Sequence, residues 1–209
     1  MPASGASVLG VILAGGLSRR MGGGDKCLRV LGGRPILAHV IDRVRPQVGR
    51  LVLNANGDPE RFRFFGLDVV PDSLAGFAGP LAGVLAGLEW AQAHAPECPW
   101  VASFPADAPF LPRALVARLL AATAGDRADL ACARSDGQDH PVVGLWPVRL
   151  AADLRSSLVE AGIRKVDLWT ARHRLAVVDF AVDAVDPFFN ANTPQDLAEA
   201  ERLLDSAAT

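Results

Sequence analysis

The amino-acid sequence predicts a single α/β domain in which helices cover both faces of a mainly parallel β-sheet. Short segments rich in β-branched residues alternate with longer segments that begin at proline, as expected for successive βαβ units. The first apolar segment ends abruptly at paired glycines, which is typical of a strand that opens into a ligand-binding loop. With 209 residues, the chain is long enough for one α/β core but short for two domains. We therefore expect residues 1–209 to form one three-layer αβα domain.

These patterns assign the strands and helices in order. The first strand is expected at Val8–Leu13, directly before the glycines. Further strands are predicted at Leu51–Ala55, Asp68–Val70, Trp100–Phe104, Asp129–Ala133, Val142–Trp146 and Leu175–Val178. Helices are predicted at Pro35–Val44, Pro80–His94, Pro112–Ala124, Pro147–Ala161 and Pro194–Leu204, each with proline in the first turn, where its missing N–H costs nothing. Ligands are then expected at the carboxyl ends of the parallel strands.

Composition and charge favour a cytoplasmic protein and argue against several classes of function. The formal net charge of −2 argues against a nucleic-acid-binding surface. The first apolar run is too short to cross a membrane, and no cationic segment precedes it as in a signal peptide. The three cysteines lie far apart and match no zinc or disulfide pattern, so we expect reduced thiols at Cys27, Cys98 and Cys132. We expect no nucleic-acid partner and no membrane association.

The segment from Val8 to Lys26 is the most informative part of the chain. It reads V-L-G-V-I-L-A-G-G-L-S-R-R-M-G-G-G-D-K. Glycines let backbone N–H groups approach an anion closely, and cationic side chains offset its charge. Residues 15–34 contain one acid, Asp25, and five cations, Arg19, Arg20, Lys26, Arg29 and Arg34. Because the whole chain is slightly acidic, this positive charge is local, and it predicts a site for nucleotide phosphates.

This loop matches neither of the two best-known phosphate-binding fingerprints. In a Walker loop Gly-Lys-Ser/Thr completes the motif, whereas here Asp25 and Lys26 follow the glycines. The dinucleotide fingerprint G-x-G-x-x-G is absent after Leu13. The remaining pattern, L-A-G-G-x-x-x-R-M-G-G-x-D-K, resembles the signature of the nucleotidyltransferases.

Polar residues follow successive predicted strands at the edge where ligands are expected. Asn54 lies at the end of the second strand, Asp72 follows the third, and Asp107 follows the fourth. Each of them alone is an ordinary turn residue, because Asn and Asp favour turns for local reasons. Their placement after successive parallel strands predicts that they converge beside the glycine loop.

Asp107 is predicted to bind Mg²⁺. It stands between Pro105 and Pro109, just past a buried strand. Nucleotidyl transfer places charge on the α-phosphate and on the leaving pyrophosphate, and Mg²⁺ neutralises that charge. Since Mg²⁺ usually takes one or two protein carboxylates besides phosphate oxygens and waters, a single aspartate suffices.

These motifs, and others along nearly the whole chain, resemble those of the molybdenum cofactor guanylyltransferases, a family of nucleotidyltransferases. The matching segments, in the family's order, are L-A-G-G-L-S-R-R-M-G-G-G-D-K (Leu13–Lys26), H-V-I-D-R-V-R-P-Q-V (His39–Val48), L-N-A-N-G (Leu53–Gly57), G-P-L-A-G-V-L-A-G-L (Gly79–Leu88), P-A-D-A-P-F-L-P (Pro105–Pro112) and F-N-A-N-T-P-Q-D-L (Phe189–Leu197). The resemblance implies a Rossmann-like nucleotidyltransferase fold, with a GTP and Mg²⁺ site in the N-terminal half and a molybdopterin site in the C-terminal half. One departure is that the family's usual Pro-Cys-Asp reads Pro105-Ala106-Asp107, which retains the carboxylate.

The resemblance also implies the residues that bind GTP. They would be Leu13, Ala14, Gly15, Gly16, Lys26, Asn54, Asp72 and Asp107. Lys26 would contact the phosphates, Asn54 and Asp72 would hold the nucleoside end, and Asp107 would bind both GTP and Mg²⁺. The catalytic residues would be Arg19, Lys26 and Asp107, acting by charge neutralisation, because the attacking phosphate is already an anion and needs no Ser-His-Asp apparatus.

The implied reaction is an attack by the terminal phosphate of molybdenum-molybdopterin on the α-phosphorus of GTP. It forms the molybdopterin guanine dinucleotide cofactor and releases pyrophosphate; a molybdenum-insertion enzyme and molybdoenzyme chaperones are the further partners. Two alternatives stay open, a CTP-dependent molybdopterin cytidylyltransferase and a non-catalytic GTP-binding protein with the same fold. The pair Gly15-Gly16 favours guanine, because the cytidine enzymes usually carry Ala-Gly there, and the presence of Lys26 and Asp107 favours catalysis.

The second substrate is assigned to the C-terminal half of the chain. The segment Thr193–Asp196 has a local explanation, since it forms a capping box with proline at the first position of the last helix. That explanation leaves two neighbouring asparagines unexplained, and the resemblance places them by the molybdopterin. The neighbouring cations Arg164 and Lys165 are a second candidate for contacting an anionic ligand. The alternative is that both are solvated on the surface. The predicted molybdopterin contacts are thus Asn190, Asn192, Arg164 and Lys165.

Overall fold

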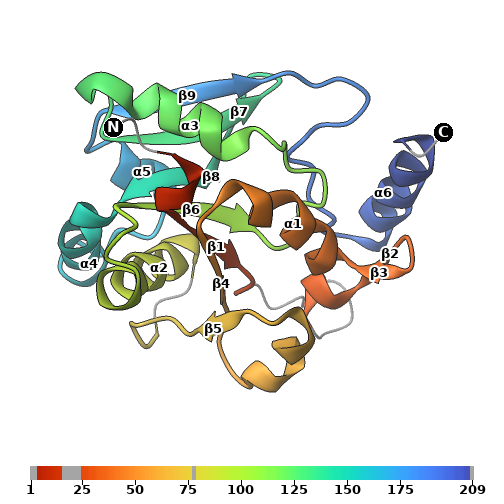
Figure 1. Ribbon diagram of the computed structural model, residues 1–209, viewed down its shortest axis with the longest axis horizontal. Coiled ribbons are helices and arrows are strands. Elements are labelled where there is room, and N and C mark those ends of the chain that lie inside the picture. Colours follow the sequence, from red (N-terminus) through yellow and green to blue (C-terminus); the bar gives the residue numbers. More distant parts are fainter. Residues whose placement is uncertain (1–3, 16–24, 77–78, 208–209) are drawn as a thin grey trace.

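The computed structural model describes residues 4–15, 25–76 and 79–207 (Figure 1). Its centre is a seven-stranded sheet in the order β5-β4-β1-β6-β8-β7-β9. The strands are β1 (Val8–Leu13), β4 (Arg50–Asn54), β5 (Asp68–Val70), β6 (Trp100–Pro105), β7 (Leu130–Ser135), β8 (Gln138–Pro147) and β9 (Leu175–Phe180). β1 is parallel to β4 and β6, β4 to β5, and β7 to β9, whereas β8 is antiparallel to both neighbours. The predicted α/β class and mainly parallel sheet are confirmed.

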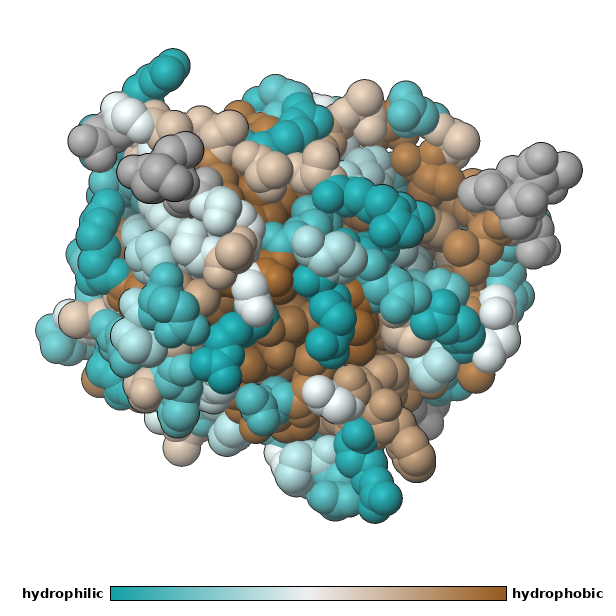
Figure 2. Space-filling view, in the orientation of Figure 1, coloured by the Kyte–Doolittle hydropathy of each residue, from teal (hydrophilic) through white to brown (hydrophobic). Residues whose placement is uncertain are grey.

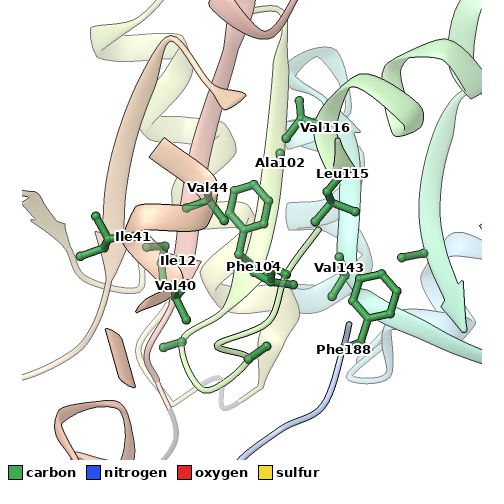
Figure 3. Packing of buried hydrophobic residues seen from close by; sticks show 14 of the residues in the cluster. Ile12, Val40, Ile41, Val44, Ala102, Phe104, Leu115, Val116, Val143 and Phe188 are labelled. Carbon is green, nitrogen blue, oxygen red and sulfur yellow. The ribbon is translucent and has the colours of Figure 1, made fainter. Parts of the chain in front are cut away.

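Helices cover both faces of this sheet (Figure 1). They are α1 (Ile36–Val44), α2 (Pro80–His94), α3 (Leu115–Thr123), α4 (Ala151–Val159), α5 (Val166–Thr170) and α6 (Pro194–Ala207). Side chains of β1 alternate between two cores, with Val8 and Ile12 packed with α1 and α3, and Leu9 and Val11 packed with α2 and α4. Figure 3 shows the first core, in which Phe104 of β6 lies between residues of α1 and α3. None of the described helices is long and apolar enough to cross a membrane.

A smaller core joins α6 to a short hairpin at the side of the domain (Figure 1). The hairpin pairs β2 (Val30–Leu31) with β3 (Arg34–Pro35), and its buried Leu31 packs with Ile36 of α1 and with Ala191 and Ala200. The sequence did not predict this hairpin, because two-residue strands carry too little alternation to be recognised.

Some predicted elements were misplaced. The helix predicted at Pro147–Ala161 was wrong at its start, because Pro147 ends β8 and α4 begins at Ala151. The helix predicted from Pro112 begins at Leu115. Among the other elements that the sequence did not predict are α5 and the 3₁₀ segment η5 (Pro59–Phe65).

The antiparallel strand β8 is longer than the predicted Val142–Trp146 because a tight turn connects it to β7. The two central residues of that turn, Asp136 and Gly137, have φ values of 45° and 73°. Positive φ at both positions is the geometry that suits a two-residue β-hairpin, and Asp-Gly is a favoured sequence for it. The turn brings the start of β8 to the edge where the parallel strands end.

Hydrophobic surface is visible at the centre of one face, among hydrophilic side chains (Figure 2). Between α1 and η5 lies an open cavity of about 600 Å³, whose lining includes Ala38, Ile41 and Phe65. None of the predicted site residues that the structure describes lines this cavity. Leu13, Asn54 and Asp107 lie instead at the carboxyl edge of the sheet.

Candidate functional site

The site is built where β1 ends, between two parallel neighbours. The register pairs Leu13 with Asn54 of β4 and with Pro105 of β6. The pairing continues past the strand, because the Ala14 N–H donates to the Asn54 carbonyl at 2.9 Å and the Ala106 N–H donates to the Leu13 carbonyl at 3.2 Å. The start of the glycine loop therefore lies between the end of β4 and the turn after β6. Gly15 is exposed there, and the predicted residues Gly16 and Arg19 fall outside the described residues.

Lys26 is the centre of the polar contacts at this edge. Its Nζ donates to Asp107 Oδ2 and to Asn192 Oδ1. The backbone adds a link, since the Ala191 N–H donates to the Asp107 carbonyl at 3.1 Å. The side chains of Lys26 and Asp107 are only 19% and 21% exposed. The structure thus brings together the predicted phosphate cation, the predicted metal carboxylate and one predicted pterin contact.

Asn54 and Asp72 form a second polar group on the other side of β1. Asn54 is 3% exposed, and its Nδ2 donates to the Val70 carbonyl at 3.1 Å and to Asp72 Oδ1 at 2.9 Å. Asn56 holds the same carboxylate from the other side, donating from Nδ2 to Asp72 Oδ2 at 2.8 Å. It also accepts from the Asp72 N–H at 2.9 Å. These bonds fix the direction of the Asp72 carboxylate at the nucleoside end of the predicted site.

Glycine lets α2 approach this group closely. A Cβ at Gly83 would lie 2.3 Å from Asn54 Oδ1 and 2.8 Å from Leu13 Cδ2, both far shorter than a real contact. The first turn of α2 is therefore packed directly on the amide of Asn54. Gly87, one turn later, is close-packed too, but a Cβ there would meet Val11 Cγ2 at 2.5 Å, inside the core.

Two residues of this edge, Asn56 and Arg61, were missed by the sequence interpretation. Arg61 Nε lies 3.0 Å from Asp25 Oδ2, and its Nη2 donates to the carbonyl of Asn56. Arg61 therefore ties the segment before Lys26 to the turn after β4. Asn56 shares the spacing of two with Asn54, which is a detectable signal, whereas nothing in the sequence around Arg61 indicates its partner.

The two predicted cations of the C-terminal half lie elsewhere. Arg164 donates from Nη1 to the Leu158 carbonyl at 2.9 Å, and its own carbonyl lies beside Gly79, just before α2. Lys165 is exposed at the start of α5. Their assignment to molybdopterin stays a prediction.

The side chains of the site suit a metal ion whose ligands come mainly from a bound nucleotide. Among the described residues no three His, Cys, Asp or Glu side chains gather as a metal site. Asp107 offers a single partly exposed carboxylate, and Mg²⁺ accepts one carboxylate when phosphate oxygens and waters complete its shell. Cys27 is no alternative ligand, because burial and the neighbouring Asp25 raise the pKa of its thiol to about 12. The residues present therefore fit Mg²⁺ bound together with a nucleotide.

Comparison with known proteins places the chain in a family. Residues 10–175 match the MobA-like NTP transferase domain. The chain belongs to this family. It is 61% identical over 197 residues to a molybdenum cofactor guanylyltransferase of Bradyrhizobium sp. (strain ORS 278), with 94% of this chain and 93% of the relative covered. A relative of the same name from Rhizobium meliloti (strain 1021) is 46% identical over 200 residues, with 93% and 90% covered.

Solved structures share the fold at much lower identity. Molybdopterin-guanine dinucleotide biosynthesis protein A of Archaeoglobus fulgidus is 22% identical, with a TM-score of 0.72 and 95% of this chain and 99% of that chain covered. A 4-diphosphocytidyl-2C-methyl-D-erythritol synthase of Anaerococcus prevotii is 16% identical, with a TM-score of 0.70 and 95% and 98% covered. The nucleotidyltransferase fold is confirmed. Because one neighbour is named for a cytidyl compound, the fold alone does not distinguish guanylyl from cytidylyl transfer.

The close packing of α2 on Asn54 predicts how Gly83→Ala will behave. The new Cβ displaces the Asn54 amide from Asp72, so we expect GTP affinity to fall about tenfold, as for the loss of one or two hydrogen bonds. Gly87→Ala is the matched control, since it crowds the same helix away from Asn54. Both variants should lose stability in thermal unfolding, and titration calorimetry of the folded proteins measures GTP affinity. Equal GTP affinities in the two variants would contradict the prediction that Asn54 helps to hold the nucleoside end of GTP.

Proposed function

We propose that this protein transfers GMP from GTP to the terminal phosphate of molybdenum-molybdopterin, releasing pyrophosphate. The contact of Lys26 with both Asp107 and Asn192 carries the proposal, because it joins the predicted phosphate, metal and acceptor residues at one edge of the sheet. The names of relatives up to 61% identical support the same reaction. We also propose that it acts in the cytoplasm, with a molybdenum-insertion enzyme and molybdoenzyme chaperones as partners.

The chemistry that these residues supply is positioning and neutralisation of charge. The acceptor phosphate is an anion and attacks without a general base, so the main barrier is repulsion between two phosphate groups. Lys26 offers a cation in a partly buried place, where its charge is screened less than at the surface. Asn54 and Asp72 hold the nucleoside end of GTP on the far side of β1 from Asp107.

Asp107 would hold Mg²⁺, which neutralises the charge on the α-phosphate and on the leaving pyrophosphate when bound. In the structure the carboxylate of Asp107 is paired with Lys26. With GTP and its metal bound, Lys26 would contact the phosphates and Asp107 would hold the metal, so each charge of the site would keep an opposite charge beside it.

The reaction is tested by incubating the protein with Mg²⁺, molybdopterin and either GTP or CTP. We expect pyrophosphate release and a guanine dinucleotide, identified by mass spectrometry, with GTP only. Formation of the cytidine dinucleotide instead would assign the chain to cytidylyl transfer. Nucleotide binding without pyrophosphate release would indicate a non-catalytic GTP-binding protein.

Replacing Asp107 should separate chemistry from nucleotide binding. We expect Asp107→Asn to slow transfer on the order of a hundredfold or more, since it removes the carboxylate proposed for the metal. GTP affinity without Mg²⁺ should not fall, because Lys26 is released from its ion pair. Asp68→Asn removes an exposed carboxylate of β5 and is the control. Near-normal turnover of a folded Asp107→Asn protein would refute the metal assignment.

Removal of the Lys26 charge should affect binding and chemistry together. Lys26→Ala is expected to lower kcat/KM for GTP on the order of tenfold to a hundredfold, because a phosphate contact serves the ground state and the transition state alike. Arg149→Ala, which removes a cation paired with Asp129, is the control. Steady-state kinetics with GTP as the varied substrate give the measurement; unchanged constants would make Lys26 a structural residue only.

The two asparagines of the C-terminal half should differ. Asn190→Ala is expected to weaken molybdopterin binding about tenfold and to leave GTP affinity unchanged, since its side chain has no recorded contact with Lys26. Asn192→Ala should alter both affinities, because its amide oxygen accepts from Lys26. Binding of each ligand is measured separately after helix content has been checked. Loss of GTP binding alone in Asn190→Ala would reverse the assignment of the two halves.

A further inference from the structure

A second polar cluster, formed by Ser135, His140 and Asp186, lies at the same edge of the sheet and has no part in the reaction described above. Ser135 is 1% exposed and stands at its centre. Its hydroxyl donates to Asp186 Oδ1 at 2.8 Å, and its Oγ lies 2.7 Å from His140 Nε2. Asp186 contacts the serine and not the histidine, so the contacts are not those of a hydrolase triad, in which the carboxylate orients the histidine.

The position of the cluster relates it to Asp107. Ser135 ends β7, which runs parallel to β9 in the same direction as β6, and His140 lies near the start of antiparallel β8. The strand order places β8 and β7 beyond β6, on the side away from β1. The cluster is therefore on the opposite side of Asp107 from β1, β4 and the nucleoside residues.

The chain itself connects the cluster to the reacting groups. Residues 186–192, called the strap below, begin at the cluster and end at Asn192, which contacts Lys26. Phe188 of the strap packs against His140 with a ring-centroid distance of 4.6 Å and belongs to the core beside Val143 of β8 (Figure 3). A ligand that lies along the strap would extend from the cluster to the phosphate site.

The hydrogen bonds of the cluster determine which groups are left for a ligand. A carboxylate only accepts, so Ser135 must give its proton to Asp186, and its oxygen then accepts from His140 Nε2–H. Burial lowers the pKa of His140, so the imidazole is neutral near pH 7 and carries that one proton. His140 Nδ1 and Asp186 Oδ2 are then acceptors without a recorded partner among the described residues.

We propose that Asp186 and His140 bind the aminopyrimidinone edge of the pterin in the acceptor substrate. That edge presents two donors, the ring N3–H and the 2-amino group, and the cluster offers two acceptors, Asp186 Oδ2 and His140 Nδ1. The assignment rests on the proposed function, which supplies a pterin phosphate as acceptor. Guanine presents a similar pair of donors, so the test must distinguish the two rings.

The probes are 6-hydroxymethylpterin and 6-hydroxymethyllumazine, which differ in the group at position 2. In lumazine a carbonyl replaces the amino group and would face an acceptor. We expect the wild-type protein to bind the pterin about tenfold more tightly than the lumazine, as measured by fluorescence titration. Equal affinities, or binding of neither probe, overturn the proposal. This measurement needs no transfer reaction, so failure of GMP transfer with intact pterin preference would refute the proposed function and not the pterin site.

The variant Asp186→Asn tests the acceptor directly. The amide oxygen can still accept from Ser135 and from the Phe188 N–H, so the cluster keeps its internal bonds while the second oxygen becomes a donor. We expect the preference for pterin over lumazine to disappear or reverse, with GTP affinity and thermal stability unchanged. Asp139→Asn is the control, because that carboxylate pairs with Arg134 outside the cluster.

Two results with Asp186→Asn would overturn the proposal. An unchanged pterin preference in the folded variant would mean that the cluster only holds the strap in place. A selective fall in GTP affinity would mean that the edge recognised is that of guanine. His140→Gln provides a second variant, since it removes the Nδ1 acceptor and should reduce the same preference without changing GTP affinity.

Discussion

The parallel pairing of β1 with β4 on one side and with β6 on the other is the constraint on which the rest of the site depends. It ends three strands at one edge of the sheet, with Leu13 between Asn54 and Pro105. Adjacent strands lie about 4.8 Å apart, so the nucleoside residues and the Asp107 turn flank the glycine loop at about one strand spacing each. A one-residue change of register would turn the side chains of β1 from one core to the other, and both cores of buried residues oppose it.

Lys26 connects the two halves of the site, because its ammonium group contacts both Asp107 and Asn192. A partly buried ammonium group needs acceptors around it, and here one comes from the β6 turn and one from the strap. In the proposed reaction a phosphate would compete with Asp107 for the same cation, and a metal on Asp107 would weaken that competitor. Nucleotide and metal would then favour each other's binding through one ion pair, and Asn192 contacts the same nitrogen atom.

The sequence was most informative where a contact has a local cause. The end of β1, the proline at the start of α2 and the carboxylate after β6 follow from apolar runs, helix starts and turn residues, and all three are where they were predicted. The start of β8 was not predicted, because Gln138–His140 is polar and lacks the apolar residues that indicate a strand. The preceding Asp136-Gly137 is nevertheless a hairpin signal. Partners such as Arg61 and Asp25 are distant in the chain, and no short-range pattern encodes their meeting.

At the end of the strap, the cap of helix α6 and the contact of Asn192 with Lys26 lie side by side. Thr193 and Asp196 form the predicted capping box, with Asp196 N–H donating to Thr193 Oγ1 at 3.1 Å and Thr193 N–H donating to Asp196 Oδ2 at 2.8 Å. The same Oδ2 also accepts from the Asn192 N–H at 2.9 Å. The cap thus fixes the backbone of Asn192, whose side chain reaches Lys26. The cap that was predicted from Thr193 and Asp196 therefore also holds the backbone of Asn192, the asparagine that capping alone had left unexplained.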